Sequence, residues 1–305
     1  MTLPDVGLIK IHPDVPVVEL QNVKCFKPEQ IALSGQCFRA EVKQNHRITR
    51  MTHWTAYGKT LKVTYGQDDS IWLWCTEQDF NEVWCDYFDL RASYQDYIQT
   101  IKKCCGKEEW LIAQYCDGLR ILRQEPFETL ISFMLSTANS IPRITSLVNA
   151  LCDKYGKLIE GTDKKAFPTW EQLQAATEQD LRDLGMGFRA AYIHQALQDR
   201  VPMSYLTRYD NLHCERTNFN HAAYRMLTKM YGVGDKVAKC VMLYGLSNMG
   251  AYPVDTWMKK VHQRMYEGCT PMWLWPDNYI ELDGLLQMYL FYNERMMSGE
   301  GKKDV

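Results

Sequence analysis

Apolar and polar residues alternate in the early part of the chain, from about residue 17 to residue 75. The alternation is clearest in residues 61–65 and 71–74, which are separated by Gly66 and the pair Asp68-Asp69. A period of two residues, broken by turn-forming residues, is typical of antiparallel strands. We therefore predict an antiparallel sheet in this part of the chain.

After Glu77 the period changes to that of helices. Helical stretches are predicted from residue 80 to about residue 124, and again from residue 127 to residue 297, with glycines and prolines at the breaks. The predicted fold class is α+β: an N-terminal domain (1–120) of antiparallel sheet and helices, then a mostly α-helical domain (121–305). The length of 305 residues suits two domains of about 150 residues each.

The most informative stretch, residues 224–244, predicts two helices joined by the short turn Gly232-Val233-Gly234. The second helix is expected to begin at Asp235. Because glycine lacks a Cβ atom, backbone N–H groups at such a turn can approach a phosphate, which the positive end of the second helix also attracts. The stretch predicts a helix-hairpin-helix that binds phosphate; an ordinary corner between two helices is the alternative.

Charge supports this prediction only locally. The net charge is −2, so the chain as a whole carries no basic field. Between Arg225 and Arg264, however, seven Lys and Arg residues face only Asp235 and Asp255, a surplus of five positive charges. Such a patch would make phosphate binding strongly salt-dependent. A solvated basic surface is the alternative.

Lys236 and Asp255 are the candidates for chemistry. Lys236 falls in the first turn of the second predicted helix, and Pro253 disfavours helix just before Asp255, which is expected to cap the next helix. An amine is a nucleophile only when neutral, and an ordinary lysine is roughly 0.1% neutral near pH 7.5. Desolvation and a helix N-terminus both favour the neutral form. Taken singly, the two could be a phosphate-binding lysine and a simple helix cap.

Several classes of protein are excluded by composition. The eleven cysteines contain no C-x-x-C pair, so a disulfide framework and a structural zinc site are both poor fits, and buried thiols in a reducing compartment are favoured. No apolar run approaches the roughly 18 residues of a membrane span, and the first residues lack the pattern of a secretory signal. We expect an intracellular monomer, cytoplasmic or nucleoid-associated if bacterial, with no metal, no cofactor and no membrane partner.

The hairpin carries a family resemblance. Residues 232–238, followed by Pro253-Val254-Asp255, resemble the signature of the helix-hairpin-helix DNA glycosylases that have a lysine next to the hairpin. Four further stretches extend the resemblance, to the 8-oxoguanine DNA glycosylase/AP lyase family, over nearly the whole chain. These are residues 34–39, 122–126, 141–144 and 184–190.

The resemblance implies base-excision repair of duplex DNA that contains 8-oxoguanine. Such an enzyme extrudes the damaged nucleotide from the duplex before acting on it. Lys236 would attack the sugar C1′ and form a Schiff base that permits strand cleavage by β-elimination. Asp255 would stabilise the cationic sugar and orient the lysine. Gly232, Val233 and Gly234 would contact the DNA backbone.

The resemblance also implies a pocket for the extruded base. Cys240 and Phe291 would form its walls, and Gln287 would bond the Watson–Crick edge. The carbonyl of Gly35 would accept the N7–H that distinguishes 8-oxoguanine from guanine. Pro253 is also assigned to base recognition. Without the family, Cys240 and Phe291 would be interpreted as core residues.

A third group would meet the opposite strand. Phe188 matches the position of the aromatic wedge, and Arg189 and Arg143 match arginines that read the orphaned cytosine. Asn139 is included here, although direct register places Ala138 where the family has the asparagine that fills the space of the extruded base. Surface salt bridges and a helix-end core contact are the alternatives for the arginines and for Phe188.

Single features argue against one related activity and exclude another. An alkyl-base glycosylase of the same fold would keep Asp255 but lack Lys236, and the iron–sulfur relatives need four clustered cysteines, whereas only Cys269 follows Cys240. The remaining alternative is a non-catalytic helix-hairpin-helix protein that binds damaged DNA. Such a protein would need neither the lysine nor the aspartate.

Overall fold

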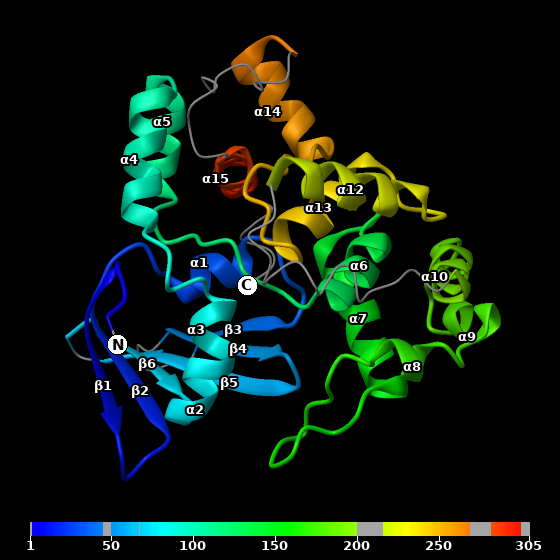
Figure 1. Ribbon diagram of the computed structural model, residues 1–305, viewed down its shortest axis with the longest axis horizontal. Coiled ribbons are helices and arrows are strands. Elements are labelled where there is room, and N and C mark those ends of the chain that lie inside the picture. Colours follow the sequence, from blue (N-terminus) through cyan, green and yellow to red (C-terminus); the bar gives the residue numbers. More distant parts are fainter. Residues whose placement is uncertain (1, 45–49, 67, 200–215, 269–281, 300–305) are drawn as a thin grey trace. The chain divides into compact units, whose positions relative to one another are not determined.

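The computed structural model describes residues 2–44, 50–66, 68–199, 216–268 and 282–299 (Figure 1). The chain divides into two compact units. Unit 1 comprises Met1–Trp54, Leu61–Arg123 and Val254–Val305, and unit 2 comprises Thr55–Thr60 and Gln124–Pro253. The C-terminal segment therefore groups with the N-terminal sheet. The domain boundary at residue 120 stays a prediction.

Unit 1 is built on a sheet whose described strands run in the order β1-β2-β6-β5-β4-β3. The two strands expected from the clearest alternation are confirmed as β5 and β6, which pair antiparallel with Val63 opposite Leu73. Both of these side chains are buried, whereas Trp72 and Trp74 on the other face of β6 are partly exposed. The strands are β1 (Val6–His12), β2 (Val17–Val23), β3 (Ala40–Gln44), β4 (Arg50–Ala56), β5 (Lys59–Tyr65) and β6 (Ile71–Trp74).

Two elements of unit 1 differ from the sequence pattern. β1 was not predicted, because its apolar residues Leu8 and Ile11 are exposed at the edge of the sheet and therefore mark no buried face. Helix α1 (Pro28–Leu33) interrupts the region in which strands were expected. Pro28 at its first position and Glu29 in its first turn are the local signals for that helix.

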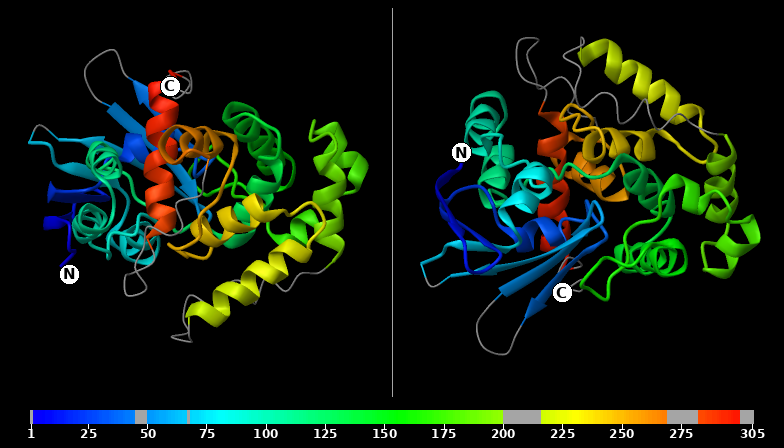
Figure 2. Two further views of the ribbon diagram at one scale, coloured as in Figure 1. Left: turned by 90° about the horizontal axis from the view of Figure 1, so that it is seen from above. Right: turned by 60° about the horizontal axis from the view of Figure 1, so that its bottom comes forward.

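Aromatic side chains connect the sheet to the helices that follow it. The ring of Trp54 on β4 meets the ring of Phe88 edge-on, with centroids 5.0 Å apart, and Phe88 meets Phe26 at 5.1 Å. Figure 1 shows α4 and α5 side by side, and the left view of Figure 2 shows α15 along its length. The helical elements are α2 (Glu77–Asp79), the π-helix η1 (Phe80–Trp84), α3 (Cys85–Tyr87), α4 (Tyr94–Cys104), α5 (Lys107–Tyr115), α14 (Thr256–Tyr266) and α15 (Asp283–Met297).

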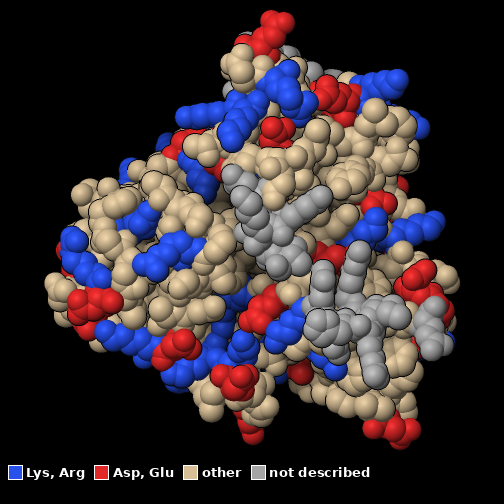
Figure 3. Space-filling view, turned by 180° about the vertical axis from the view of Figure 1, so that it is seen from behind, with Lys and Arg blue, Asp and Glu red and all other residues tan. Residues whose placement is uncertain are grey.

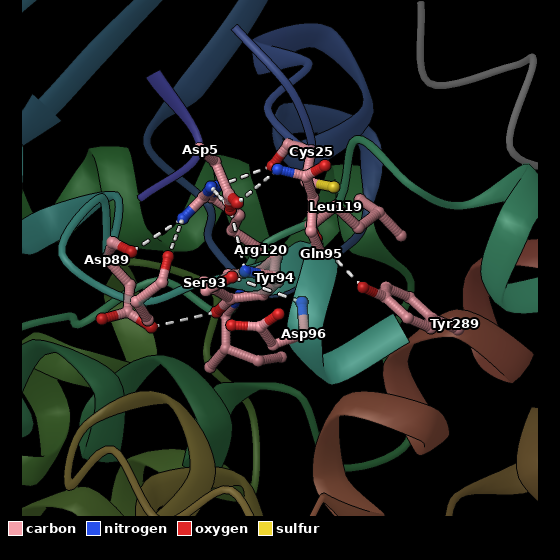
Figure 4. A network of polar contacts seen from close by, with 12 residues as sticks. Asp5, Cys25, Asp89, Ser93, Tyr94, Gln95, Asp96, Leu119, Arg120 and Tyr289 are labelled. Atoms are coloured by element: carbon pink, nitrogen blue, oxygen red, sulfur yellow. Dashed lines mark hydrogen bonds and ion pairs between the residues drawn. The ribbon is translucent and has the colours of Figure 1, made fainter. Parts of the chain in front are cut away.

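A buried ion pair lies in the core of unit 1 (Figure 4). The side chains of Asp5 and Arg120 are both fully buried, and the guanidinium of Arg120 donates to the Asp5 carboxylate. It also donates to the carbonyls of Cys25, at 2.6 Å, and Asp89, at 2.8 Å. The network therefore joins segments that lie far apart in the sequence.

Most of the described residues of unit 2 after Gln124 lie in helices or in the turns between them. Helices α6 and α13 lie in close contact: the Gln124 N–H donates to the Tyr244 carbonyl at 2.8 Å, and a Cβ atom at Gly245 would lie 3.2 Å from Pro126 Cα. The helix predicted to begin at Asp235 is confirmed as α13. The helices are α6 (Pro126–Leu135), α7 (Ile141–Tyr155), α8 (Trp170–Leu173), α9 (Glu178–Asp183), α10 (Arg189–Gln198), α12 (Arg216–Lys229) and α13 (Asp235–Tyr244).

No helix within the described ranges is both long enough and apolar enough to span a lipid bilayer.

Candidate active site

The predicted hairpin joins α12 to α13, and its two glycines have different roles. Gly232 has a φ of +82°, and a Cβ atom there would lie 2.4 Å from the ring of Tyr192. Gly234 has a φ of −89°, and a Cβ atom there would meet nothing within 4 Å. The N–H of Val233 donates to the Met230 carbonyl at 3.1 Å, so this group closes the turn.

The amine of Lys236 lies against α6. Its Nζ donates to the hydroxyl of Ser136 at 2.7 Å and lies 5.0 Å from the centroid of the Phe133 ring. The Phe133 ring stacks on Tyr244 of α13, with centroids 5.4 Å apart and an interplanar angle of 18°. The lysine side chain is half-buried. Two helices of unit 2 therefore hold the amine in a defined place.

The carboxylate next in sequence to this lysine has other partners. Asp235 pairs with Lys239 at 3.0 Å and accepts the hydroxyl of Tyr224 at 2.8 Å. That hydrogen bond raises the pKa of Tyr224. At the opposite end of α6, burial raises the pKa of Glu125, which caps the helix.

The loop after α6 is held by Arg189. Its Nε donates to the Thr137 carbonyl and its Nη2 to the Ala138 carbonyl, both at 2.7 Å. The guanidinium also lies 4.5 Å from the centroid of the Phe188 ring. Burial, and then the nearby charge of Arg143, lower the pKa of Arg189. Arg189 is thus a buried arginine that fixes a loop, which neither sequence interpretation anticipated.

The other residues assigned to the opposite strand are closer to the surface. Phe188 is 48% exposed, and its ring meets that of Tyr192 edge-on at 5.7 Å. Arg143 is exposed and donates to the Gly185 carbonyl at 3.0 Å. The side chain of Asn139 donates to the Leu135 carbonyl at 3.1 Å and so closes the end of α6.

In unit 1, Asp255 caps α14 as expected. Its Oδ1 accepts the N–H groups of Trp257, at 3.0 Å, and Met258, at 2.9 Å. These bonds fix the orientation of the carboxylate. Asp255 belongs to unit 1 and Lys236 to unit 2, so their pairing stays a prediction.

Three residues assigned to base recognition also belong to unit 1. Gln287 on α15 is buried, and its Oε1 atom has no hydrogen-bond partner among the described residues. Phe291, one turn further, is half-buried under the guanidinium of Arg295, which lies 5.5 Å from the ring centroid. Arg295 also donates to the Leu33 carbonyl at 3.2 Å, two residues before Gly35. The structure therefore brings α15 and the Gly35 segment together.

The conformation of the Gly35 segment is fixed by a residue that sequence reasoning missed. Gly35 has a φ of +80°, which favours glycine. Gln36 is fully buried; its amide donates to the Arg120 carbonyl at 2.9 Å, and its Oε1 accepts the Leu122 N–H at 2.8 Å. Gln36 lies within the motif of residues 34–39, whereas Ser136 and Arg295 lie outside the motifs of the sequence. Only the contacts of these residues reveal their roles.

The remaining assigned residues, Cys240 and Pro253, are buried in unit 2. The predicted basic patch is smaller than its count of charges suggested. Arg264 pairs with Glu108, at 2.7 Å, and with Glu294, at 3.1 Å. On the face shown in Figure 3, basic and acidic side chains are interspersed.

Comparisons with known proteins identify the family of this chain. The family described as "8-oxoguanine DNA glycosylase, N-terminal domain" matches residues 18–130, and "HhH-GPD superfamily base excision DNA repair protein" matches residues 131–270. The N-glycosylase/DNA lyase of Saccharomyces cerevisiae is 40% identical over 160 residues, which are 49% of this chain and 42% of that protein. An Arabidopsis thaliana relative, N-glycosylase/DNA lyase OGG1, is 33% identical over 48% of this chain and 40% of its own length. The chain thus spans about two fifths of the length of these curated relatives.

One solved structure is similar along its whole length. It is the Clostridium acetobutylicum 8-oxoguanine glycosylase/lyase, in complex with double-stranded DNA containing cytosine opposite 8-oxoguanine. The sequences are 30% identical and the TM-score is 0.83, over 96% of this chain and 99% of that one. The fold and the hairpin thus define a helix-hairpin-helix class of base-excision repair protein. Within that class, the chain belongs to the 8-oxoguanine DNA glycosylase/lyase family.

Proposed function

We propose that this protein is a bifunctional DNA glycosylase and AP lyase that removes 8-oxoguanine from duplex DNA. The observation that carries the proposal is the amine of Lys236, held at 2.7 Å from Ser136 in the first turn after the hairpin. A helix N-terminus attracts phosphate, so the hairpin can bind the DNA backbone beside the amine. The DNA-bound Clostridium relative supports duplex DNA as the partner.

The reaction needs the neutral amine of Lys236. Its nitrogen forms a bond to C1′ of the extruded nucleotide, while the bond from C1′ to the base breaks and the base leaves with the electron pair. Loss of a proton from nitrogen and opening of the sugar give the Schiff base. Removal of a C2′ proton then expels the 3′ phosphate, which cleaves the strand.

Asp255 stabilises the positive charge that develops on the sugar during base release. Its Oδ1 is fixed by the two N–H groups of α14, so the carboxylate needs little reorganisation when the charge appears. Stabilisation that acts only in the transition state raises the rate and leaves substrate affinity largely unchanged.

Base recognition rests on Gln287 in this proposal. A buried amide oxygen without a donor costs about 1–3 kcal/mol, and the N–H groups on the Watson–Crick edge of a guanine would satisfy it. Phe291 in unit 1, and Cys240 and Pro253 in unit 2, are each assigned to contact the extruded base. The Gly35 carbonyl accepts the N7–H of the oxidised base and repels the lone pair of guanine N7, which is the basis of damage selectivity.

Phe188 is the wedge of the proposed complex, since its exposed ring is supported by Tyr192 and Arg189. Arg143 reads the cytosine, while Arg189 and Asn139 keep the adjacent loop in place. Gly232, Val233 and Gly234 lie along the phosphates. The protein acts as an intracellular monomer.

Borohydride trapping on a duplex with 8-oxoguanine opposite cytosine tests the proposal. The wild-type protein is expected to form a covalent adduct, and Lys236→Gln is expected to abolish it while keeping lesion binding within about threefold, because only the nucleophile is lost. Lys239→Gln, which removes a neighbouring amine of the same helix, is the matched control and should still trap. A wild-type protein that binds the lesion without trapping would instead be a damage-binding protein.

Asp255→Asn tests the second catalytic residue. The neutral amide can still accept both α14 N–H groups, so the fold is expected to hold. Single-turnover base release should fall by about 100-fold or more, with the Kd for lesion DNA little changed. A rate within a few-fold of wild type would reduce Asp255 to a helix cap.

A further inference from the structure

The C-terminal end of α6 places one hydroxyl against the amine of Lys236. Ser136 is the residue that follows the last turn of α6. Its Oγ donates a hydrogen bond to the Phe133 carbonyl at 2.6 Å and accepts one from Lys236 Nζ at 2.7 Å. A single hydroxyl therefore joins the end of one helix to the nucleophile on another.

The direction of these two bonds determines what the hydroxyl can do. A serine hydroxyl has one hydrogen and two lone pairs. Its hydrogen is directed to the Phe133 carbonyl, so only a lone pair is available to the lysine. The contact holds one N–H of the amine, and this holds for the neutral amine as well, because the neutral amine still carries N–H groups.

The Phe133 ring limits the amine from a second direction. Nζ lies 5.0 Å from the ring centroid, and the ring is held by its stack on Tyr244. With one N–H on Ser136 and the ring alongside, the nitrogen lone pair has few directions left. A lysine side chain otherwise has four rotatable bonds, and most of its rotamers would point the amine elsewhere.

The position of Ser136 is itself fixed. Arg189 binds the carbonyls of the next two residues, Thr137 and Ala138, and Asn139 closes the helix end on Leu135. The carboxylate nearest in sequence to the lysine, that of Asp235, has other partners. The hydroxyl is therefore a rigid reference point for the amine.

We propose that Ser136 is the positioning residue of the nucleophile: its hydroxyl orients the Lys236 amine for attack on C1′. The inference rests on the proposed function of Lys236. It goes beyond that function, because a residue outside the hairpin determines the orientation of the amine. Misplacement of a reacting group by about 1 Å can lower a rate by about 100-fold. The hydroxyl therefore governs the rate of attack and leaves DNA affinity unchanged.

The test compares three substitutions at position 136 by single-turnover release of 8-oxoguanine opposite cytosine. Ser136→Ala is expected to slow base release by about 10–100-fold, with the Kd for the same duplex within about twofold of wild type. Ser136→Thr keeps the hydroxyl, which threonine can also direct to the carbonyl three or four residues earlier, and should recover to within about threefold. Should Ser136→Ala fail to fold in urea titrations, Ser136→Cys replaces it, since a thiol is a weak hydrogen-bonding group of similar shape.

Ser132→Ala is the matched control, because it removes a buried hydroxyl from the same helix one turn earlier. Its rate should stay within about twofold of wild type. The inference is overturned if Ser136→Ala releases base as fast as wild type, if Ser136→Thr is as slow as Ser136→Ala, or if Ser132→Ala is equally slow. Absence of release and trapping in the wild-type protein would overturn the proposed function itself, which separates the two failures.

Discussion

At the scale of single residues, Ala138 combines two unusual features. Its φ is +49°, a left-handed conformation that is strained for alanine and tolerated better by asparagine. Its carbonyl is fixed by Arg189, so the loop cannot relax easily. The sequence resemblance implies an asparagine at this position, and the backbone here has the conformation that suits that residue.

Ala138→Asn is therefore expected to raise the free energy of unfolding by about 0.5–1 kcal/mol, measured by urea titration. It should also steepen the preference for cytosine, because each polar contact to the opposite base typically contributes about 1–3 kcal/mol. The measurement is single-turnover excision from four duplexes that differ only in the base opposite 8-oxoguanine.

Ala138→Gly separates the two effects, since glycine relieves the backbone without adding an amide. Glycine relieves the strain of the positive φ in the folded state, but it also makes the unfolded chain more flexible, and the two effects oppose each other in the free energy of unfolding. The preference for the opposite base should stay unchanged. A wild-type preference for cytosine above about a thousandfold would show that the missing asparagine is replaced by another contact, and would contradict the register argument.

The residues of the site differ in how far their sequence context reveals them. The position of Asp255 after Pro253 predicted a helix cap, because a local rule governs that position, and the cap is confirmed. The contact of Ser136 with Lys236 joins residues 100 positions apart. No local rule predicts such a contact, so the hydroxyl emerged only from the structure.

At the scale of elements, the hairpin shows why a motif with two glycines needs separate explanations for each. The fold requires glycine at position 232, because φ is positive there and a Cβ atom would collide with the ring of Tyr192. Gly234 has an ordinary φ and open space around it. It is the N-cap residue of α13, where glycine is preferred to alanine, and no described neighbour obstructs a Cβ atom there. The proposed approach of a phosphate would be a second reason for glycine at this position.

Alanine at each position should therefore have a different effect. Gly232→Ala is expected to lower the free energy of unfolding by about 1–3 kcal/mol, from backbone strain and displacement of Tyr192. Gly234→Ala should lower the free energy of unfolding by at most about 1 kcal/mol, because alanine is a poorer N-cap than glycine. It should bind duplex DNA more weakly, because its Cβ atom would obstruct the phosphate.

Urea titration measures the first effect, and fluorescence anisotropy of labelled duplex DNA at low and moderate salt measures the second. Gly58→Ala, also in open space but at a turn with a φ of +69°, is the control for backbone strain at a glycine outside the hairpin. Unchanged DNA affinity in Gly234→Ala would mean that the phosphate does not approach this glycine.

Element prediction succeeded where one face of an element is buried. β5 and β6 alternate because Leu61, Val63, Ile71 and Leu73 point into the core. β1 lacks that signal because it is an edge strand. The periodicity of a sequence records burial, so elements at an edge leave a weaker pattern.

At the scale of the whole molecule, the compact units are not continuous segments of the sequence. Val254–Val305 forms a compact unit with the N-terminal sheet. Arg295 reaches the Leu33 carbonyl, and the thiol of Cys116 donates to the Tyr289 carbonyl at 3.6 Å. The sequence pattern defined α15 as a helix but contained no information on its distant partners, since periodicity describes only local neighbours.

The buried pair of Asp5 and Arg120 connects this tertiary arrangement to the site (Figure 4). The pair is fully removed from water, and the carbonyl of Arg120 accepts the amide of Gln36 next to Gly35. The ion pair therefore supports the segment whose carbonyl is proposed to read the oxidised base. Removing one partner of the pair leaves the other charge buried and unpaired, which is far more destabilising than losing an exposed pair.

Asp5→Ala is expected to lower the free energy of unfolding by about 3–5 kcal/mol, because the guanidinium of Arg120 stays buried without its counter-ion. Arg120→Lys should also be destabilising, since an ammonium cannot replace the several guanidinium bonds to Asp5, Cys25 and Asp89. Arg91→Met breaks the exposed pair with Asp86 and should lower the free energy of unfolding by at most about 1 kcal/mol.

Urea titration ranks the three variants, and the ratio of 8-oxoguanine to guanine excision reports on the Gly35 segment. If Arg120→Lys is as stable as Arg91→Met and keeps that ratio, the network neither stabilises unit 1 nor supports the carbonyl of Gly35.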